Sequence, residues 1–130
     1  MSAEARIREL RLELPPPPKP AGVYQPVVVV GNMAYVSGHG PLKPDGSMIT
    51  GRVGADLDVH AGYAAARQVG LAVLASVRAA LGSLDRVKRV VKTLGMVNSA
   101  PDFTQHPAVI NGFSELLAEV FGKEHGIGAR

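Results

Sequence analysis

Two short apolar runs separated by a turn signal form the clearest pattern of hydrophobic and polar positions in the chain. Residues 27–30 are four consecutive valines, residues 33–36 read Met-Ala-Tyr-Val, and Gly31-Asn32 lies between them. Glycine and asparagine readily adopt the positive φ angles that a tight hairpin turn requires. The pattern predicts an antiparallel hairpin, with Tyr24 and Ser37 toward the same end of its ladder.

Two longer segments carry the period of an amphipathic helix. From Asp58, a suitable N-cap, to about Leu81, small and apolar residues recur at helical spacing, and Gly82 follows as a C-cap. His106-Pro107 begins a second predicted helix, which ends near Gly122. We expect one apolar stripe of each helix to pack on a sheet, which the small residues of the first helix would approach closely.

Two further strands are predicted, at residues 48–53 and 87–98, because both segments are rich in β-branched residues. The expected order is therefore β-β-β-α-β-α, an α+β fold in which two helices cover one face of a mixed sheet. The other face needs a cover as well, and we expect another subunit to supply it.

The N-terminal segment predicts a separate arm. Residues 3–14 alternate charged and apolar side chains, which favours a short helix or an extended arm lying on the body of the protein. Prolines at positions 15–18 and 20 then favour a stiff polyproline connector, although such a run also suits an SH3-type ligand. We expect residues 1–20 to be the arm and connector and residues 21–130 to be the domain.

Composition narrows the class of protein. A chain of 130 residues with 46% hydrophobic content suits one globular domain. It has no cysteine, which excludes disulfides, thiolate nucleophiles and cysteine-type zinc sites. We expect no signal peptide, no apolar run of about 20 residues for a membrane, and a cytoplasmic location. The net charge of +3 comes from scattered residues, so nucleic acid is not the expected partner.

The common catalytic motifs are absent, so single residues carry the candidate chemistry. The four histidines are widely spaced, and no metal site is expected from them. His39 follows Ser37 closely and suits either a pocket or a turn. Ser37 has no adjacent base, which favours hydrogen bonding over nucleophilic attack. Tyr24 suits a pocket wall or a strand-end core position, and Arg130 alone would be a surface charge.

A resemblance to a known family implies a fold, an assembly and an activity that residue spacing alone does not indicate. The chain resembles the Rid family of reactive intermediate deaminases, also called YjgF, over about residues 21–130. The matching positions are Tyr24, Gly31-Asn32-Met33, Tyr35-Val36-Ser37-Gly38, Asp102-Phe103, Asn111 and Ala129-Arg130. The resemblance implies a chorismate mutase-like fold and a homotrimer with three clefts between subunits.

The resemblance also implies an activity, namely hydrolysis of an enamine or imine such as 2-aminoacrylate to a 2-keto acid and ammonia, without metal or cofactor. It implies Arg130 and Tyr24 as the catalytic residues. The guanidinium of Arg130 would bind the substrate carboxylate in a bidentate manner, and Tyr24 would form a polar wall or a proton-transfer contact.

The remaining substrate-binding residues implied are Ser37, Gly38, His39 and Asn111. Ser37 and the Gly38 amide would hydrogen-bond water or substrate, and Asn111 would support the cleft from a helix. His39 stands where the best-known deaminases carry glutamine, which allows a different substrate.

Members of the family continue beyond the position of Arg130 through strands that include a glutamate thought to position water. We expect that the sequence omits this C-terminal piece. Two other functions stay open. One is a non-catalytic trimer that binds small carboxylates. The other is a ribonuclease or translation inhibitor, against which the lack of a basic and aromatic stripe argues.

Overall fold

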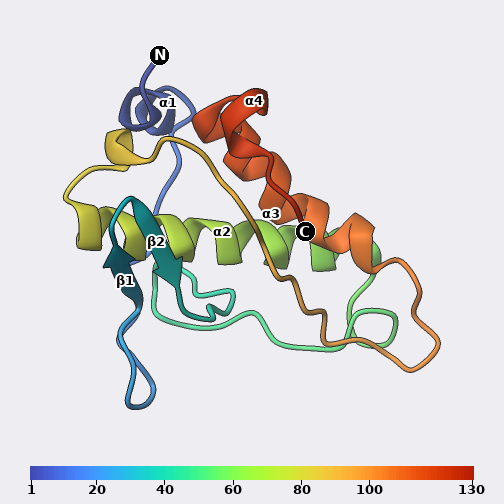
Figure 1. Ribbon diagram of the computed structural model, residues 1–130. Coiled ribbons are helices and arrows are strands. Elements are labelled where there is room, and N and C mark those ends of the chain that lie inside the picture. The colour runs from blue at the N-terminus through green and yellow to red at the C-terminus, as the bar shows by residue number, and fades with distance from the viewer.

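The computed structural model describes residues 1–130 and contains four α-helices, one short 3-10 helix and one β-hairpin (Figure 1). In chain order these are α1 (Ala3–Glu9), β1 (Val27–Val30), β2 (Met33–Val36), α2 (Val59–Leu81), η1 (Leu84–Arg86), α3 (His106–Phe121) and α4 (Lys123–Gly126). The α+β class predicted from the sequence is confirmed, with a small sheet and predominant helices.

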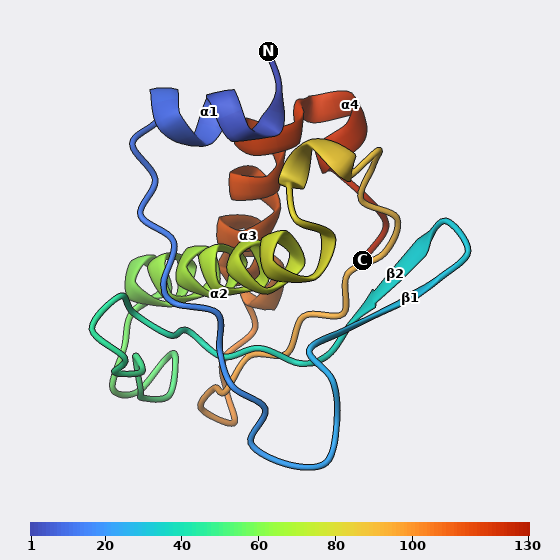
Figure 2. The same cartoon turned by 90° about the vertical axis from the view of Figure 1, so that its left-hand side faces the viewer.

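The predicted hairpin is present with the expected turn. β1 and β2 pair antiparallel, from Val27 opposite Val36 to Val30 opposite Met33. Gly31 has a φ of 60°, the left-handed conformation that glycine adopts without a steric penalty. Beyond the ladder, the Ser37 amide donates to the Pro26 carbonyl at 2.9 Å. The hairpin extends away from the helices (Figure 2).

Both predicted helices are confirmed, and so are the two caps predicted for the first of them. The Asp58 side chain accepts a hydrogen bond from the Ala61 amide at 2.8 Å at the start of α2. Gly82 ends α2 in the left-handed conformation, with a φ of 84°. α3 begins at His106, with proline in its first turn, and Gly122 follows it.

The two further predicted strands were wrong. Residues 48–53 and 87–98 form only isolated bridges, so the sheet is two-stranded rather than mixed and the order β-β-β-α-β-α does not hold. Val53 bridges Ser99, and Lys92 bridges Ala129. A β-branched sequence suits a pleated surface, but a strand needs a continuous partner, and here each segment pairs over only one or two residues.

The helices pack chiefly on one another rather than on a sheet. α2 crosses the molecule beside α3 (Figures 1 and 2). Gly112 of α3 lies against the α2 backbone at Tyr63 and Arg67, and Gly70 of α2 faces Leu116. The small residues expected to approach a sheet thus allow close contact between two helices.

The N-terminal helix belongs to the main hydrophobic core. Its residues Ala3 and Ile7 are buried in a cluster with side chains of α2, η1 and α3. The members of this cluster are Ala3, Ile7, Leu74, Val77, Leu84, Leu116, Leu117 and Val120. The division of the chain at residue 20 stays a prediction, but the segment before it packs as part of the body.

An ion pair fastens α1 to α2. The Glu4 carboxylate accepts hydrogen bonds from Arg78 Nη2 at 2.6 Å and Nε at 3.2 Å, and from the Leu84 amide at 2.9 Å. The hydrogen bonds from Arg78 are the main reason that the pKa of Glu4 lies below its usual value of 4.5. The pair therefore stabilises the fold while Glu4 is ionised.

α2 is long and apolar enough, by length and composition alone, to cross a membrane, whereas the sequence pattern suggested no such segment. The core helix of a soluble protein meets the same criterion, so the finding is weak evidence. Eight residues of α2 are buried, and those of its inner face contact α3 and η1. Packing within the protein therefore accounts for part of the apolar character of α2, whose most apolar window is 39% buried.

Candidate functional site

Arg130 lies in an open cavity of about 440 Å³ beside the middle of α3. Its Nη1 donates to Asn111 Oδ1 at 2.9 Å and to Ser114 Oγ at 3.4 Å, and its Nη2 donates to the Pro107 carbonyl at 3.4 Å. The lining residues are Asn111, Ser114, Glu115, Ile127, Gly128 and Arg130. The structure thus brings together two of the predicted site residues, Arg130 and Asn111.

The backbone fixes the end of the chain in this place. The Ala129 amide donates to the Val91 carbonyl at 2.9 Å, and the Thr93 amide donates to the Ala129 carbonyl at 2.8 Å. The extended segment after η1 therefore holds residue 129, and the next side chain reaches α3. Figure 2 shows the C-terminus beside this segment.

The guanidinium of Arg130 retains unused capacity to bind an anion. Arginine offers five N–H donors, and three of them have partners here, which leaves two. All three partners are neutral oxygens, and Arg130 has no ion pair. A charged, planar and partly exposed guanidinium in a cavity suits a small carboxylate ligand.

A carboxylate borders the same cavity. Glu115 follows Asn111 by one helical turn, and its carboxylate accepts a hydrogen bond from the Tyr63 hydroxyl of α2. This contact is the main reason that the pKa of Tyr63 is raised above its usual value of 10.0, with burial adding to it. One turn further along α3, Glu119 pairs with Arg67 at 2.8 Å. Tyr63 therefore keeps its proton and donates it in a hydrogen bond to the Glu115 carboxylate.

The other predicted site residues lie in a second cluster at the base of the hairpin. Ser37 Oγ donates to the Gln25 carbonyl at 2.6 Å, and the Tyr24 hydroxyl oxygen accepts from the Ala21 amide at 3.0 Å. Tyr24 is 47% exposed, and the space where a side chain would begin at Gly38 is open. Tyr24 and Ser37 do lie at the same end of the ladder, as the hairpin pattern predicted.

His39 joins the segment after β2 to α2. Its Nδ1 lies 2.7 Å from the Ser37 carbonyl, and its Nε2 lies 2.7 Å from Ser76 Oγ. A carbonyl only accepts, so Nδ1 donates to it, and Nε2 forms a hydrogen bond with the Ser76 hydroxyl. Both ring nitrogens are therefore engaged within the chain.

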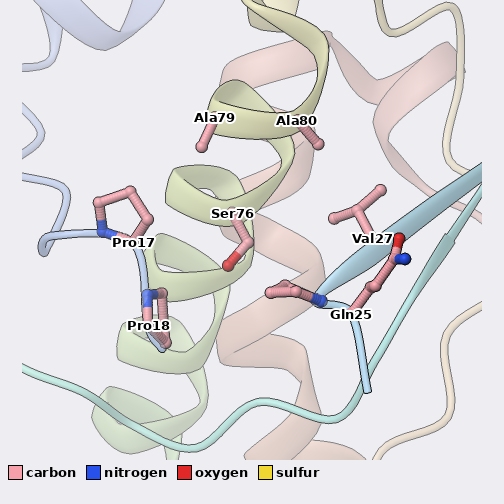
Figure 3. A pocket seen from close by; sticks show the side chains of 8 residues that line it. Pro17, Pro18, Gln25, Val27, Ser76, Ala79 and Ala80 are labelled. Carbon is pink, nitrogen blue, oxygen red and sulfur yellow. The ribbon is translucent and has the colours of Figure 1, made fainter. Parts of the chain in front are cut away.

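Ser76 also lines a second cavity, of about 300 Å³, between the proline connector and α2. Figure 3 shows Ser76 on α2, with Gln25 and Val27 on one side and the connector prolines on the other. Ser76 is only 3% exposed, and its hydroxyl is committed to His39. This cavity therefore offers little chemistry beyond apolar contact.

No hydrogen bond joins the two clusters within the chain, and neither of the two cavities described above contains residues of both. Arg130 and Asn111 lie at α3, whereas Tyr24, Ser37, Gly38 and His39 lie at the base of the hairpin. No group of three histidine, aspartate or glutamate side chains is arranged to hold a metal ion. The assignment of all six residues to one site therefore stays a prediction.

Sequence reasoning missed Ser114, Glu115 and Tyr63. Ser114 and Glu115 follow Asn111 at the third and fourth positions of a helix, which places all three side chains on one face. That spacing was the available signal. No sequence pattern links Tyr63 to this site, because it belongs to another helix and lies 52 residues away from Glu115.

Comparison with known proteins identifies close relatives. A model of the family described as "YjgF/chorismate mutase-like, putative endoribonuclease" matches residues 4–130. Protein TCP17 of Trypanosoma cruzi is 46% identical over 126 residues, which cover 97% of this chain and 79% of TCP17.

Two solved structures share the fold. Atu1372 of Agrobacterium tumefaciens, a protein "with unknown function", is 41% identical with a TM-score of 0.86, over 98% of this chain and 77% of that chain. A "putative endoribonuclease" of Shewanella oneidensis MR-1 is 34% identical with a TM-score of 0.91, over 100% of this chain and 89% of that chain.

Proposed function

Because the chain belongs to the YjgF/chorismate mutase-like family, we propose that it is an enamine/imine deaminase that hydrolyses small 2-imino acids, of the 2-aminoacrylate type, to 2-keto acids and ammonia. The observation that carries the proposal is the cavity at Arg130, where a guanidinium without an ion pair keeps two donors available. A 2-imino acid presents a carboxylate that fits this guanidinium, with the reactive carbon one bond away.

Hydrolysis of such a substrate requires few catalytic groups from the protein. The carbon of a protonated imine is already electrophilic, so water attacks it without a metal or cofactor. Holding the carboxylate, placing a water molecule and assisting proton transfer are then sufficient, and fixed polar side chains supply all three. Arg130 binds the carboxylate, and Asn111 and Ser114 fix the orientation of its guanidinium.

We place the second half of the site on a neighbouring copy of the chain. Tyr24 and Ser37 lie at the base of a hairpin whose apolar side chains are exposed, with Val29 at 50% and Tyr35 at 59%. An uncovered apolar surface of this kind suits an interface. A homotrimer in which the hairpin of one subunit faces the Arg130 cavity of the next would complete three identical clefts.

One alternative has a specific observation in its favour. The name of the Shewanella relative suggests RNA cleavage, and this chain carries four exposed basic residues just after α2, namely Arg86, Lys88, Arg89 and Lys92. RNA binding through them would weaken steeply with added salt. Titration of a single-stranded RNA probe at two salt concentrations tests for RNA binding through these residues. The absence of binding at low salt would exclude the ribonuclease alternative.

The deaminase is tested by a coupled assay. An L-amino-acid oxidase generates the imino acid, semicarbazide traps it, and a deaminase lowers the yield of semicarbazone. We expect wild type to lower the yield and Arg130→Ala to lose the effect. Binding of a 2-keto acid without turnover would instead favour a non-catalytic carboxylate-binding protein.

A further inference from the structure

We propose that Ser76 and His39 are a pair of positioning residues that fixes the direction of the Gly38 N–H at the base of the hairpin. The inference rests on the proposed function, to which the base of the hairpin contributes half of the site. It adds Ser76 to that site and changes the role of His39. In place of binding substrate, His39 acts through the peptide unit between Ser37 and Gly38.

Ser76 is the one buried polar side chain of the protein, at 3% exposure. The other buried residues of α2 are glycine, alanine, leucine and valine, and alanine at this position would favour a helix interior more than serine does. A buried hydroxyl costs stability unless it has a hydrogen-bond partner. The partner of Ser76 Oγ is His39 Nε2, at 2.7 Å. The contact with His39 therefore accounts for a serine in this apolar helix.

The ring of His39 has no free nitrogen with which to bind a substrate. Its Nδ1 donates to the Ser37 carbonyl at 2.7 Å, and its Nε2 is engaged by Ser76. Each ring nitrogen takes part in one hydrogen bond, so both are used within the chain. The ring is half-buried between the segment after β2 and α2. His39 can therefore influence the site only through the carbonyl that it holds.

The carbonyl of Ser37 and the N–H of Gly38 belong to the same peptide unit. No peptide bond of the chain is cis, and in a planar trans peptide the C=O and the N–H point in opposite directions. A side chain that holds the carbonyl thus also sets the direction of the N–H. The Gly38 N–H has no partner within the chain, and Gly38 is exposed, with open space where a Cβ would stand. It is therefore an oriented donor that a ligand can reach.

The pair connects this peptide unit to the rigid part of the protein. Two other hydrogen bonds of Ser37 lead only to the start of the hairpin, from its amide to the Pro26 carbonyl at 2.9 Å and from its Oγ to the Gln25 carbonyl at 2.6 Å. His39 instead reaches α2 through Ser76, which Figure 3 shows on the helix beside Gln25. The pair therefore fixes the Gly38 N–H relative to α2.

The experiment determines kcat/KM in the coupled assay for wild type, Ser76→Ala, Ser76→Thr, His39→Ala, the double variant with alanine at both positions, and the matched control Gln68→Ala. Gln68 is also on α2, and its Nε2 donates to the Leu42 carbonyl at 2.6 Å, four residues beyond Gly38. Far-UV circular dichroism and the melting temperature confirm that each variant is folded. The NMR resonance of the Gly38 amide reports on the peptide unit without any turnover.

We expect Ser76→Ala to lower kcat/KM about fivefold, which corresponds to one neutral hydrogen bond of about 1 kcal/mol. His39→Ala should lower it about 25-fold, because both contacts of the ring are lost. The double variant should equal His39→Ala, since Ser76 acts only through His39.

Ser76→Thr keeps the hydroxyl, and the cavity of about 300 Å³ beside Ser76 has room for the added methyl group. We therefore expect Ser76→Thr to match wild type in activity, as Gln68→Ala should. The Gly38 resonance should shift in Ser76→Ala and stay in place in the other two. A merely structural loss would affect Gln68→Ala as well.

The inference and the function on which it rests fail separately. If wild type is active but Ser76→Ala keeps its kcat/KM and its Gly38 resonance, the deaminase stands and the role of Ser76 is refuted. Losses that multiply in the double variant, or equal losses in Ser76→Ala and Gln68→Ala, also refute it. An inactive wild type refutes the deaminase, and the Gly38 resonance then decides whether the pair orients this peptide unit.

Discussion

Gly112→Ala should destabilise the fold even though alanine is the better helix former. Gly112 lies within α3, and a Cβ added there would overlap the Tyr63 carbonyl of α2. A further contact, with the Arg67 amide, would stand at 3.2 Å, tighter than most real Cβ contacts. Both obstacles are backbone atoms, so a change of rotamer cannot remove them, and the two helices must move apart.

The expected loss follows from two opposing effects. Alanine in place of glycine favours a helix interior by about 1 kcal/mol. Forcing extra volume into a packed contact costs about 1–3 kcal/mol and occasionally more, and the overlap with backbone places this site at the upper end. We therefore expect a net loss of about 2 kcal/mol in the free energy of unfolding. In a chain of this length that lowers the melting temperature by about 6–10 °C.

Urea unfolding followed by far-UV circular dichroism measures the difference, with the slope against urea expected to stay unchanged. Gly70→Ala is the matched control, because its added Cβ would meet Leu116 Cδ2 at 2.7 Å, the far end of a flexible side chain. The control should lose less stability than Gly112→Ala. A Gly112→Ala protein as stable as wild type would refute the close contact of α2 and α3 at Gly112.

Three further predictions concern the arm, the cavity and the hairpin. The pKa of Glu4 is lowered in the folded protein, so its pair with Arg78 adds stability above about pH 4.5, and this is lost as the pH falls through the lowered pKa. Glu4→Gln should therefore lower the free energy of unfolding by about 1 kcal/mol at pH 7, and progressively less in acid unfolding curves below pH 4.5. Asn111→Ala should raise the KM of the deaminase about fivefold, because Arg130 loses the side chain that fixes its orientation. Asn111→Asp should raise the KM further, because the new carboxylate would pair with the guanidinium and compete with the substrate. If steady-state kinetics show no change of KM in either variant, the cavity is not the substrate site. Val29→Lys should lower the native mass in light scattering and abolish activity, whereas an active variant of unchanged mass would count against the interface at the hairpin.

Local signals sufficed to predict the hairpin and both long helices. Asp58 and Gly82 cap α2, and Gly31 turns the hairpin, each through its own backbone and nearest neighbours. The segments 48–53 and 87–98 were mistaken for strands because strand formation depends on a distant partner. Residues 90–93 find theirs only at 125–129, over too short a stretch for a ladder.

The candidate site was predictable only in part for the same reason. Resemblance to a family pointed to Arg130 and Asn111, and the structure joins them by a hydrogen bond across 19 residues. Glu115 depends on Tyr63 and His39 on Ser76, and both partners come from α2, far away in sequence. Side-chain pairs across packed helices leave no periodic trace that a single sequence displays.

The most direct test of the account is the rate of semicarbazone formation in the oxidase-coupled assay, measured with wild type and with folded Arg130→Ala protein. The account predicts that wild type suppresses the semicarbazone in proportion to its concentration and that Arg130→Ala does not. Wild type without effect on several imino acids, or an Arg130→Ala protein as active as wild type, would contradict it.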